Sequence, residues 1–276
     1  MNFSVNPIRN PRYFMNYHLP CKADKGFNRI LSIGQAEMEL TGFGLLKLAA
    51  GEKFSTTTGA LEIALVILGG RCAVRGADFD FPEVGKRKDV FSGLPYTVYL
   101  PAGTQYEIVA TTEVEIAVSE SPTTKRGGQA TLIGPDKVKS LSIGRDNFMR
   151  QALIMLDDKF PSEHFFIGEA LVPSGNWASF PPHRHEFDNL PAEVDMEEIY
   201  FFRFNPKGGF GVQKIYTDSR DIDVAYTVQE NDTVAIPRGY HPVVNAPGYT
   251  MYYLWVMTGN TRGFINFKDP AHSWIK

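Results

Sequence analysis

Short stretches rich in β-branched and aromatic residues recur along the whole chain, and each ends at Gly, Pro, Asn or Asp. Examples are EIALVILGG, YTVYLPAG, EEIYFFRF, GVQKIYT, DTVAIPRG and TMYYLWVMTG. Such stretches are typical of β-strands, and turn signals about every 8–12 residues are typical of β-sandwiches and barrels. Helical periodicity is scarce, and the glycines in QAEMELTGFGLLKL argue against a helix there. The pattern therefore predicts an all-β protein.

The second half of the chain repeats the pattern of the first half. The segment YTVYLPAGTQYEIVATTEVEIAVSE aligns with DTVAIPRGYHPVVNAPGYTMYYLWVM, which places residues 101–103 on residues 237–239. Upstream, LEIALVILGG aligns with EEIYFFRFNPKGG and sets Glu62 against Glu198. A repeat of this length indicates two copies of one barrel. Two unrelated strand-rich domains are the alternative explanation.

The repeat predicts an N-terminal domain over residues 1–135 and a C-terminal domain over residues 136–276. They are joined near residues 123–140, which are polar and rich in glycine like a linker. The chain has no histidine between His18 and His164, so the histidines of the second copy have no counterparts in the first. We therefore expect a C-terminal barrel that carries the chemistry and an N-terminal barrel without metal ligands.

Composition narrows the class of protein. With 276 residues, 43% hydrophobic and 21% charged, the chain is typical of a folded protein with a sizeable core. A net charge of −3 gives no indication of nucleic acid as a partner, and the apolar runs are too short to span a membrane. Cys21 and Cys72 form no C-x-x-C motif, and the first 20 residues do not resemble a signal peptide. A cytoplasmic protein is expected.

A group of histidines and one glutamate indicates a metal site. His183 and His185 are two residues apart, so in an extended strand their imidazoles project to the same side. Glu198 opens the next strand, and His241 follows a Pro-x-Gly turn that would aim its ring back. Glu197 and Glu198 face opposite sides of a strand, so one of them can share the site, and Glu198 is favoured. Three nitrogens and one oxygen suit Zn, Mn, Fe or Ni, with Zn slightly favoured.

These segments resemble known sequence motifs. HRH…EEIYFF followed by NDTVAIPRGYHPVVN resembles the two motifs of the cupin superfamily, although the loop between His185 and Glu198 is longer than usual there. PPHRH, VAIPRGYHPV, APGYTMYYLWVMTG and the ending DPAHSWI together resemble the 5-deoxy-glucuronate isomerase family of inositol catabolism. The resemblance implies a bicupin with two tandem β-barrels. It also implies the metal ligands His183, His185, Glu198 and His241.

The resemblance further implies an aldose–ketose isomerisation of a small sugar acid, from 5-deoxy-D-glucuronate to 5-dehydro-2-deoxy-D-gluconate. An enediolate intermediate and a hydride shift are both open as mechanisms. Glu198 is a candidate proton carrier and Tyr253 a candidate acid. A substrate carboxylate requires a cation near the barrel mouth, for which Lys214 is the chosen candidate. Tyr200, Tyr252, Arg203 and Arg238 are further candidates for these roles.

Two other functions compete with the isomerase. An oxygen-using cupin, such as a dioxygenase or oxalate-cleaving enzyme, can be built on the same ligands and would require oxygen. A non-catalytic bicupin would bind a sugar acid without turnover. Because cupin edges commonly pair between subunits, a homo-oligomer is also expected.

Overall fold

The computed structural model describes residues 15–275, so the expectation about a signal peptide falls mostly on residues 1–14, outside that range. Within the described range the chain forms strands and three short 3₁₀ helices, with no α-helix. The 3₁₀ helices are η1 (Pro135–Lys137), η2 (Asp146–Phe148) and η3 (Pro270–His272). No helix among the described residues is long and apolar enough to cross a membrane. The prediction of an all-β fold is confirmed.

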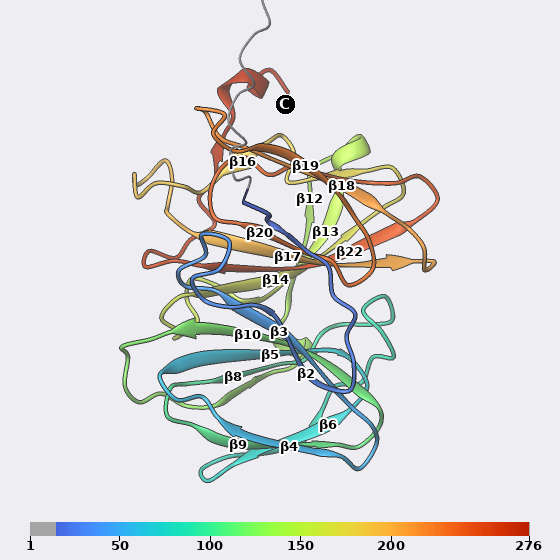
Figure 1. Ribbon diagram of the computed structural model, residues 1–276, viewed down its shortest axis with the longest axis vertical. Helices are drawn as coiled ribbons and strands as arrows, with labels where there is room; N and C mark the ends of the chain where they lie inside the picture. The colour runs from blue at the N-terminus through green and yellow to red at the C-terminus, as the bar shows by residue number, and fades with distance from the viewer. Residues whose placement is uncertain (1–14, 276) are drawn as a thin grey trace, which may run out of the picture.

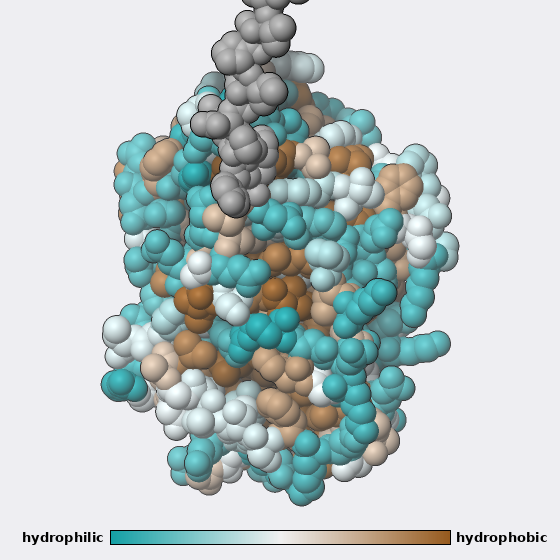
Figure 2. Space-filling view, in the orientation of Figure 1, coloured by the Kyte–Doolittle hydropathy of each residue, from teal (hydrophilic) through white to brown (hydrophobic). Residues whose placement is uncertain are grey.

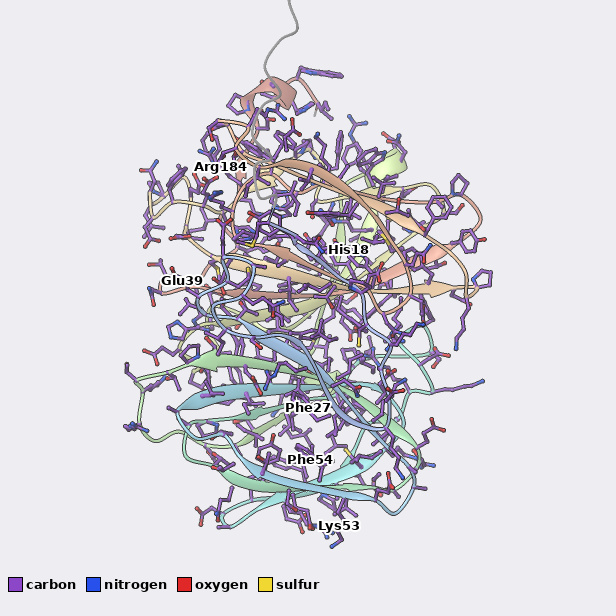
Figure 3. All side chains as sticks on the ribbon, viewed as in Figure 1. His18, Phe27, Glu39, Lys53, Phe54 and Arg184 are labelled. Carbon is purple, nitrogen blue, oxygen red and sulfur yellow. The ribbon has the colours of Figure 1, made fainter. Side chains whose placement is uncertain are left out.

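The N-terminal half forms one six-stranded and one four-stranded sheet. Its strands are β2 (Gly26–Leu31), β3 (Gly42–Leu48), β4 (Lys53–Thr57), β5 (Leu61–Gly69), β6 (Cys72–Gly76), β7 (Asp80–Val84), β8 (Thr97–Leu100), β9 (Gln105–Ala110), β10 (Val114–Pro122) and β11 (Thr131–Ile133). The larger sheet has the order β11-β8-β5-β10-β3-β2, and the smaller one β4-β9-β6-β7. Alternate residues such as Ile63, Leu65 and Ile67 fill the barrel with apolar side chains, and Phe27 and Phe54 pack against them (Figure 3). This interior is a packed core.

The C-terminal half has the same construction. Its strands are β12 (Lys139–Ile143), β13 (Arg150–Leu156), β14 (Phe165–Val172), β15 (Trp177–Ala178), β16 (His183–Arg184), β17 (Glu197–Asn205), β18 (Gly211–Tyr216), β19 (Asp223–Val228), β20 (Thr233–Ile236), β21 (Val243–Asn245), β22 (Thr250–Thr258) and β23 (Phe267–Lys268). Six of these strands and β1 (His18–Leu19) form a seven-stranded sheet in the order β1-β20-β17-β22-β14-β13-β12. The sheet β15-β21-β18-β19 lies opposite, as the labelled strands β18 and β19 show in Figure 1. β16 pairs with β23.

The first described strand crosses from one half to the other. β1 pairs with β20, and His18 Nε2 lies 2.8 Å from Asp232 Oδ2. The N-terminal segment thus contributes to the C-terminal sheet, although the sequence repeat assigns residues 1–135 to the N-terminal domain. Apart from β1, the strands up to β11, which ends at Ile133, belong to the N-terminal sheets. Those from β12, which begins at Lys139, belong to the C-terminal sheets.

The larger sheets of the two halves face each other, so the molecule is a stack of four β-layers (Figure 1). The rings of Phe43 and Phe201, one from each large sheet, lie 5.6 Å apart in this contact. Figure 2 shows hydrophilic residues over most of one face, with hydrophobic residues gathered near mid-height, where the halves meet. The contact continues one hydrophobic core from the C-terminal half into the N-terminal half.

Buried glutamates also link the two halves. Glu197 accepts hydrogen bonds of 2.7 and 2.9 Å from the backbone N–H groups of residues 39–40. Glu62 accepts two bonds of 2.8 Å from the N–H groups of residues 163–164. Glu62 therefore has the role of Glu197, whereas the sequence alignment set it against Glu198. The alignment is displaced by one residue, and one residue along a strand exchanges the inner for the outer face.

Candidate metal centre

A short strand pairing holds His183 and His185. β16 pairs with β23, and Arg184 between the histidines is buried and donates to Glu193 Oε1 at 3.0 Å. The Arg184 guanidinium also pairs with Asp218 (Arg184 is labelled in Figure 3). Because neighbouring side chains of an extended segment point to opposite sides, anchoring Arg184 outward turns both imidazoles into the barrel, where they line a cavity.

A sharp turn brings His241 to the same place. Gly239 has a φ of 92°, and a Cβ there would lie 2.7 Å from the carbonyl oxygen of Tyr216. The turn after β20 therefore requires glycine, which has neither the side chain nor the steric restriction. The backbones of Tyr216 and Tyr240 exchange two hydrogen bonds, of 2.8 and 2.9 Å, which holds the turn in place. The His241 side chain is fully buried.

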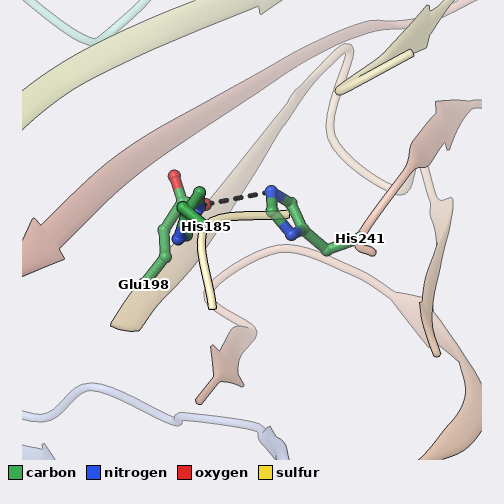
Figure 4. Close-up of side chains that lie close together, drawn as sticks. All are labelled: His185, Glu198 and His241. Atoms are coloured by element: carbon green, nitrogen blue, oxygen red, sulfur yellow. Dashed lines mark hydrogen bonds and ion pairs between the residues drawn. The ribbon is translucent and has the colours of Figure 1, made fainter. Parts of the chain in front are cut away.

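The hydrogen bonds of the imidazoles determine which ring nitrogen faces the site. His241 Nδ1 lies 2.9 Å from the carbonyl oxygen of Gly239, and His185 Nδ1 contacts that of Met196. A carbonyl oxygen accepts, so each Nδ1 carries the hydrogen and each Nε2 is left with a lone pair. Both Nε2 atoms approach the same oxygen, Glu198 Oε2, at 3.1 Å from His185 and 3.2 Å from His241 (Figure 4).

The buried group His185, Glu198 and His241 fits a divalent cation. Its three ligand atoms all lie within 4.8 Å of one another. A proton shared by His185 and Glu198 satisfies that pair, but His241 Nε2 is buried and has no hydrogen-bond partner. A divalent cation would accept all three electron pairs at once, and imidazole with carboxylate is a common ligand set for first-row metals.

His183, the fourth predicted ligand, lies beside this group. Its ring stands edge-on to that of His241, with ring centres 4.9 Å apart, and 6.5 Å from the ring centre of His185. Its ring nitrogens do not come within 4.8 Å of all three ligand atoms. The structure thus brings three of the four predicted residues together, and ligation by His183 stays a prediction.

Burial and charge set the protonation of these side chains. Burial and the neighbouring His185 lower the pKa of His183 to about 3. Burial also lowers the pKa of His241 well below its usual value, so both rings are neutral at pH 7. For His185, burial is outweighed by the hydrogen bond and charge of Glu198, and the pKa is raised. Burial raises the pKa of Glu198. Neutral imidazoles are the form that binds metals.

A small cavity of about 30 Å³ lies next to the group. Tyr200 and Tyr253 form part of its wall, with ring centres 4.3 Å apart, and the Tyr200 hydroxyl lies 2.6 Å from Ser179 Oγ. Burial raises the pKa of Tyr253, although the nearby Arg150 lowers it. Tyr253 therefore lines the cavity as a neutral phenol, and its role as an acid stays a prediction. The rest of the wall is mainly apolar and includes Ile154, Ala170, Trp255, Met257 and Phe264.

Lys214 does not line the cavity. It is partly exposed, and its Nζ lies 2.8 Å from Asp223 Oδ1. The preceding residue, Gln213, is fully buried and donates to the carbonyl oxygen of His241 at 2.7 Å. Since Gln213 points inward, alternation along β18 turns Lys214 outward. Its predicted contact with a substrate carboxylate does not match this position.

Arg150 lines the cavity, although it was not predicted from the sequence as a site residue. It begins β13, and Arg150, Ala152 and Ile154 alternate along that strand as cavity-lining residues. The same alternation is visible in RQALIML, so strand parity placed this arginine on one face with two small or apolar residues. The sequence contains no signal that tells which face of β13 lies inside the barrel.

Comparison with known proteins places this architecture in a family. Residues 17–275 match the model of the KduI/IolB family. The chain is 40% identical to the 5-deoxy-glucuronate isomerase of Geobacillus kaustophilus, over 86% of each chain. An IolB-like protein from Salmonella typhimurium has a TM-score of 0.90 at 32% identity, covering 94% of this chain and 98% of that one.

More distant similarity concerns the fold alone. Oxalate decarboxylase of Bacillus subtilis, a bicupin with Mn(II) centres, has a TM-score of 0.62 at 10% identity. The match covers 93% of this chain and 80% of that chain. The tandem cupin fold expected from the sequence is confirmed, and the chain belongs to the KduI/IolB family.

Proposed function

We propose that this chain is a metal-dependent aldose–ketose isomerase that converts 5-deoxy-D-glucuronate to 5-dehydro-2-deoxy-D-gluconate. The observation that carries the proposal is the convergence of two imidazole lone pairs and a carboxylate beside a buried cavity. Membership of a family with a relative named 5-deoxy-glucuronate isomerase supports this choice of substrate. Within residues 15–275 this is the group of side chains with metal-ligand geometry.

His185, Glu198 and His241 would hold the ion, with His183 as the proposed fourth ligand. A bound divalent ion would supply a Lewis acid for the carbonyl and hydroxyl oxygens of the substrate. Two or three nitrogens and one oxygen suit Zn, Mn, Fe or Ni, and we favour Zn.

The chain's own residues provide the proton chemistry. The reaction takes a proton from the carbon that bears the hydroxyl and returns one to the neighbouring aldehyde carbon. Glu198 is the proposed proton carrier, because its carboxyl lines the cavity and burial raises its pKa, which makes the carboxyl easier to protonate. Tyr253 keeps its proton and would donate a hydrogen bond to a substrate oxygen. The apolar wall limits the water that competes for these groups.

Anaerobic turnover tests the proposal. Purified protein is loaded with one divalent metal at a time and incubated with 5-deoxy-D-glucuronate under nitrogen, with the ketose product followed by NMR. We expect conversion without oxygen, loss of conversion on chelation, and recovery when metal is restored. His183→Ala and His241→Ala are each expected to abolish conversion. A requirement for oxygen, or binding without turnover, would contradict the proposal and favour one of the two competing functions.

We further propose that the enzyme is a cytoplasmic homo-oligomer whose N-terminal barrel, residues 1–135, supports the C-terminal barrel, residues 136–276. The apolar filling of the N-terminal barrel and the interbarrel contacts of Glu62 and Glu197 support a structural role for that half. Light scattering of the purified protein would measure the oligomer, and a monomeric mass would contradict this part of the proposal.

A further inference from the structure

Arg150 is a buried cation in the wall of the cavity that contains His185 and Glu198. Its side chain comes from the start of β13, directly after η2. Its Nη1 lies 3.5 Å from the carbonyl oxygen of Phe148, which is a long and weak hydrogen bond. The guanidinium is close enough to His183 to add to the fall in that ring's pKa, after burial and His185. Arg150 therefore faces the space next to the metal group.

The other buried arginines are all neutralised by carboxylates. Four arginines are buried in the described part of the chain. Arg87 makes two bonds to Glu169, and Arg184 pairs with acids of its own barrel. Arg203 pairs with two glutamates. Among residues 15–275 no carboxylate lies within 4 Å of the Arg150 guanidinium. Arg150 is thus the one buried arginine of the described residues that has no carboxylate partner.

A buried guanidinium without a carboxylate partner is costly, and neither the Phe148 carbonyl nor the Tyr253 hydroxyl beside Arg150 supplies a counter-charge. Guanidinium groups keep their proton in proteins, so loss of the charge offers no relief. The stable arrangements for such a group are a carboxylate or phosphate that binds its planar N–H fork. A cavity that presents this fork is therefore complementary to a small molecule with an anionic end.

We infer that Arg150 binds the carboxylate of the sugar acid and thereby places its other end at His185, Glu198 and His241. This inference rests on the proposed function and names the residue that selects an acid over a neutral sugar. Arg150 thus takes the role that was predicted for Lys214, that of the cation that binds the substrate carboxylate. The apolar side chains of Ile154, Ala170 and Trp255 face the same space and would contact the carbon chain between the two ends. Because that space is about 30 Å³, it must widen when the sugar acid enters.

Binding of a matched pair of ligands tests the inference without turnover. 2-Deoxy-D-gluconate carries the carboxylate but no ketone, and 2-deoxy-D-glucitol has an alcohol in place of the carboxylate. Calorimetry measures both ligands on the metal-loaded protein, on Arg150→Met and on Arg75→Gln. Arg75 is the matched control, an exposed arginine of the N-terminal barrel that pairs with Asp80. Circular dichroism establishes that each variant is folded.

We expect the wild type and Arg75→Gln to prefer the acid, and Arg150→Met to bind it about 10- to 100-fold more weakly, with affinity for the alcohol unchanged. Arg150→Lys keeps the charge without the fork and is expected to lie between them. If Arg150→Met does not fold, the loss of preference is read from Arg150→Lys. An undiminished preference for the acid in the folded Arg150 variant overturns the inference.

Turnover separates the inference from the proposed function. If the wild type isomerises 5-deoxy-D-glucuronate and Arg150→Met has an unchanged KM, the inference fails and the proposed function stands. If the wild type does not isomerise the sugar acid but binds 2-deoxy-D-gluconate through Arg150, the proposed function fails and the carboxylate site stands. An Arg150→Met enzyme with a raised KM and a largely kept kcat supports both.

Discussion

The buried pair of Arg87 and Glu169 is expected to hold the two barrels together. Arg87 comes from the loop after β7 and Glu169 from β14, and both side chains are 1% exposed. Two charged hydrogen bonds of 2.6 and 2.8 Å join them, and the Tyr252 hydroxyl donates to the same carboxylate at 2.7 Å. Glu169→Gln leaves the guanidinium buried without its counter-charge. We expect the free energy of unfolding to fall by about 3–5 kcal/mol.

A double-mutant cycle measures the pair by equilibrium urea unfolding of the metal-free protein. Arg87→Met is expected to cost a similar amount, because it leaves a buried carboxylate that keeps only the Tyr252 bond. Combining Arg87→Met with Glu169→Gln removes both charges, so we expect the double variant to be several kcal/mol more stable than the sum of the single effects predicts.

The exposed pair of Arg75 and Asp80 is the control for this cycle. These side chains are 49% and 61% exposed and lie 3.0 Å apart, so Asp80→Asn is expected to cost less than about 1 kcal/mol. If Glu169→Gln destabilises the protein no more than Asp80→Asn does, burial does not decide the strength of the interbarrel pair, which contradicts the prediction.

Three further outcomes are expected. Gly239→Ala should weaken metal binding measured by calorimetry, because the new Cβ meets the Tyr216 carbonyl at 2.7 Å and displaces the His241 ring; unchanged affinity would show that the turn tolerates a side chain. Lys214→Met should leave KM for the sugar acid within about twofold, since the exposed pair with Asp223 contributes little, and a larger rise would restore the sequence-based role. The pKa of His183 is about 3 in the folded protein, so between pH 6.5 and 3 this ring takes up a proton in the unfolded chain but stays neutral in the folded one. Stability of the metal-free protein should therefore fall by about 1.4 kcal/mol per pH unit between pH 6.5 and 3 through this residue, and His183→Gln should remove that slope in urea unfolding.

The N-terminal barrel shows how one fold gives two kinds of interior. Along β5 the inward residues Ile63, Leu65 and Ile67 are aliphatic and close the barrel, whereas along β17 the inward residues include Glu198 and Tyr200 beside a cavity. The repeated strand pattern is the same in both halves. The chemistry of the inward positions, and not the topology, separates the packed half from the half with a candidate site.

Much of this protein was determined by local sequence. Strand composition and turn residues were enough for an all-β fold, because alternation and Gly or Pro breaks act over a few residues. The spacing of His183 and His185, the strand-opening Glu198 and the Pro-x-Gly turn before His241 identified the candidate site. The outward direction of Lys214 was not deducible without knowing which face of β18 lies inside.

The remaining features depend on contacts between residues far apart in the chain. The pairing of β1 with β20, the role of Glu62 at the interbarrel contact and the unpaired charge of Arg150 follow from no local pattern. A sequence shows that an arginine is charged, but only the folded chain decides whether a carboxylate reaches it. Parity is the physical reason for the divide: periodicity tells which residues share a face, and packing alone decides which face becomes the interior.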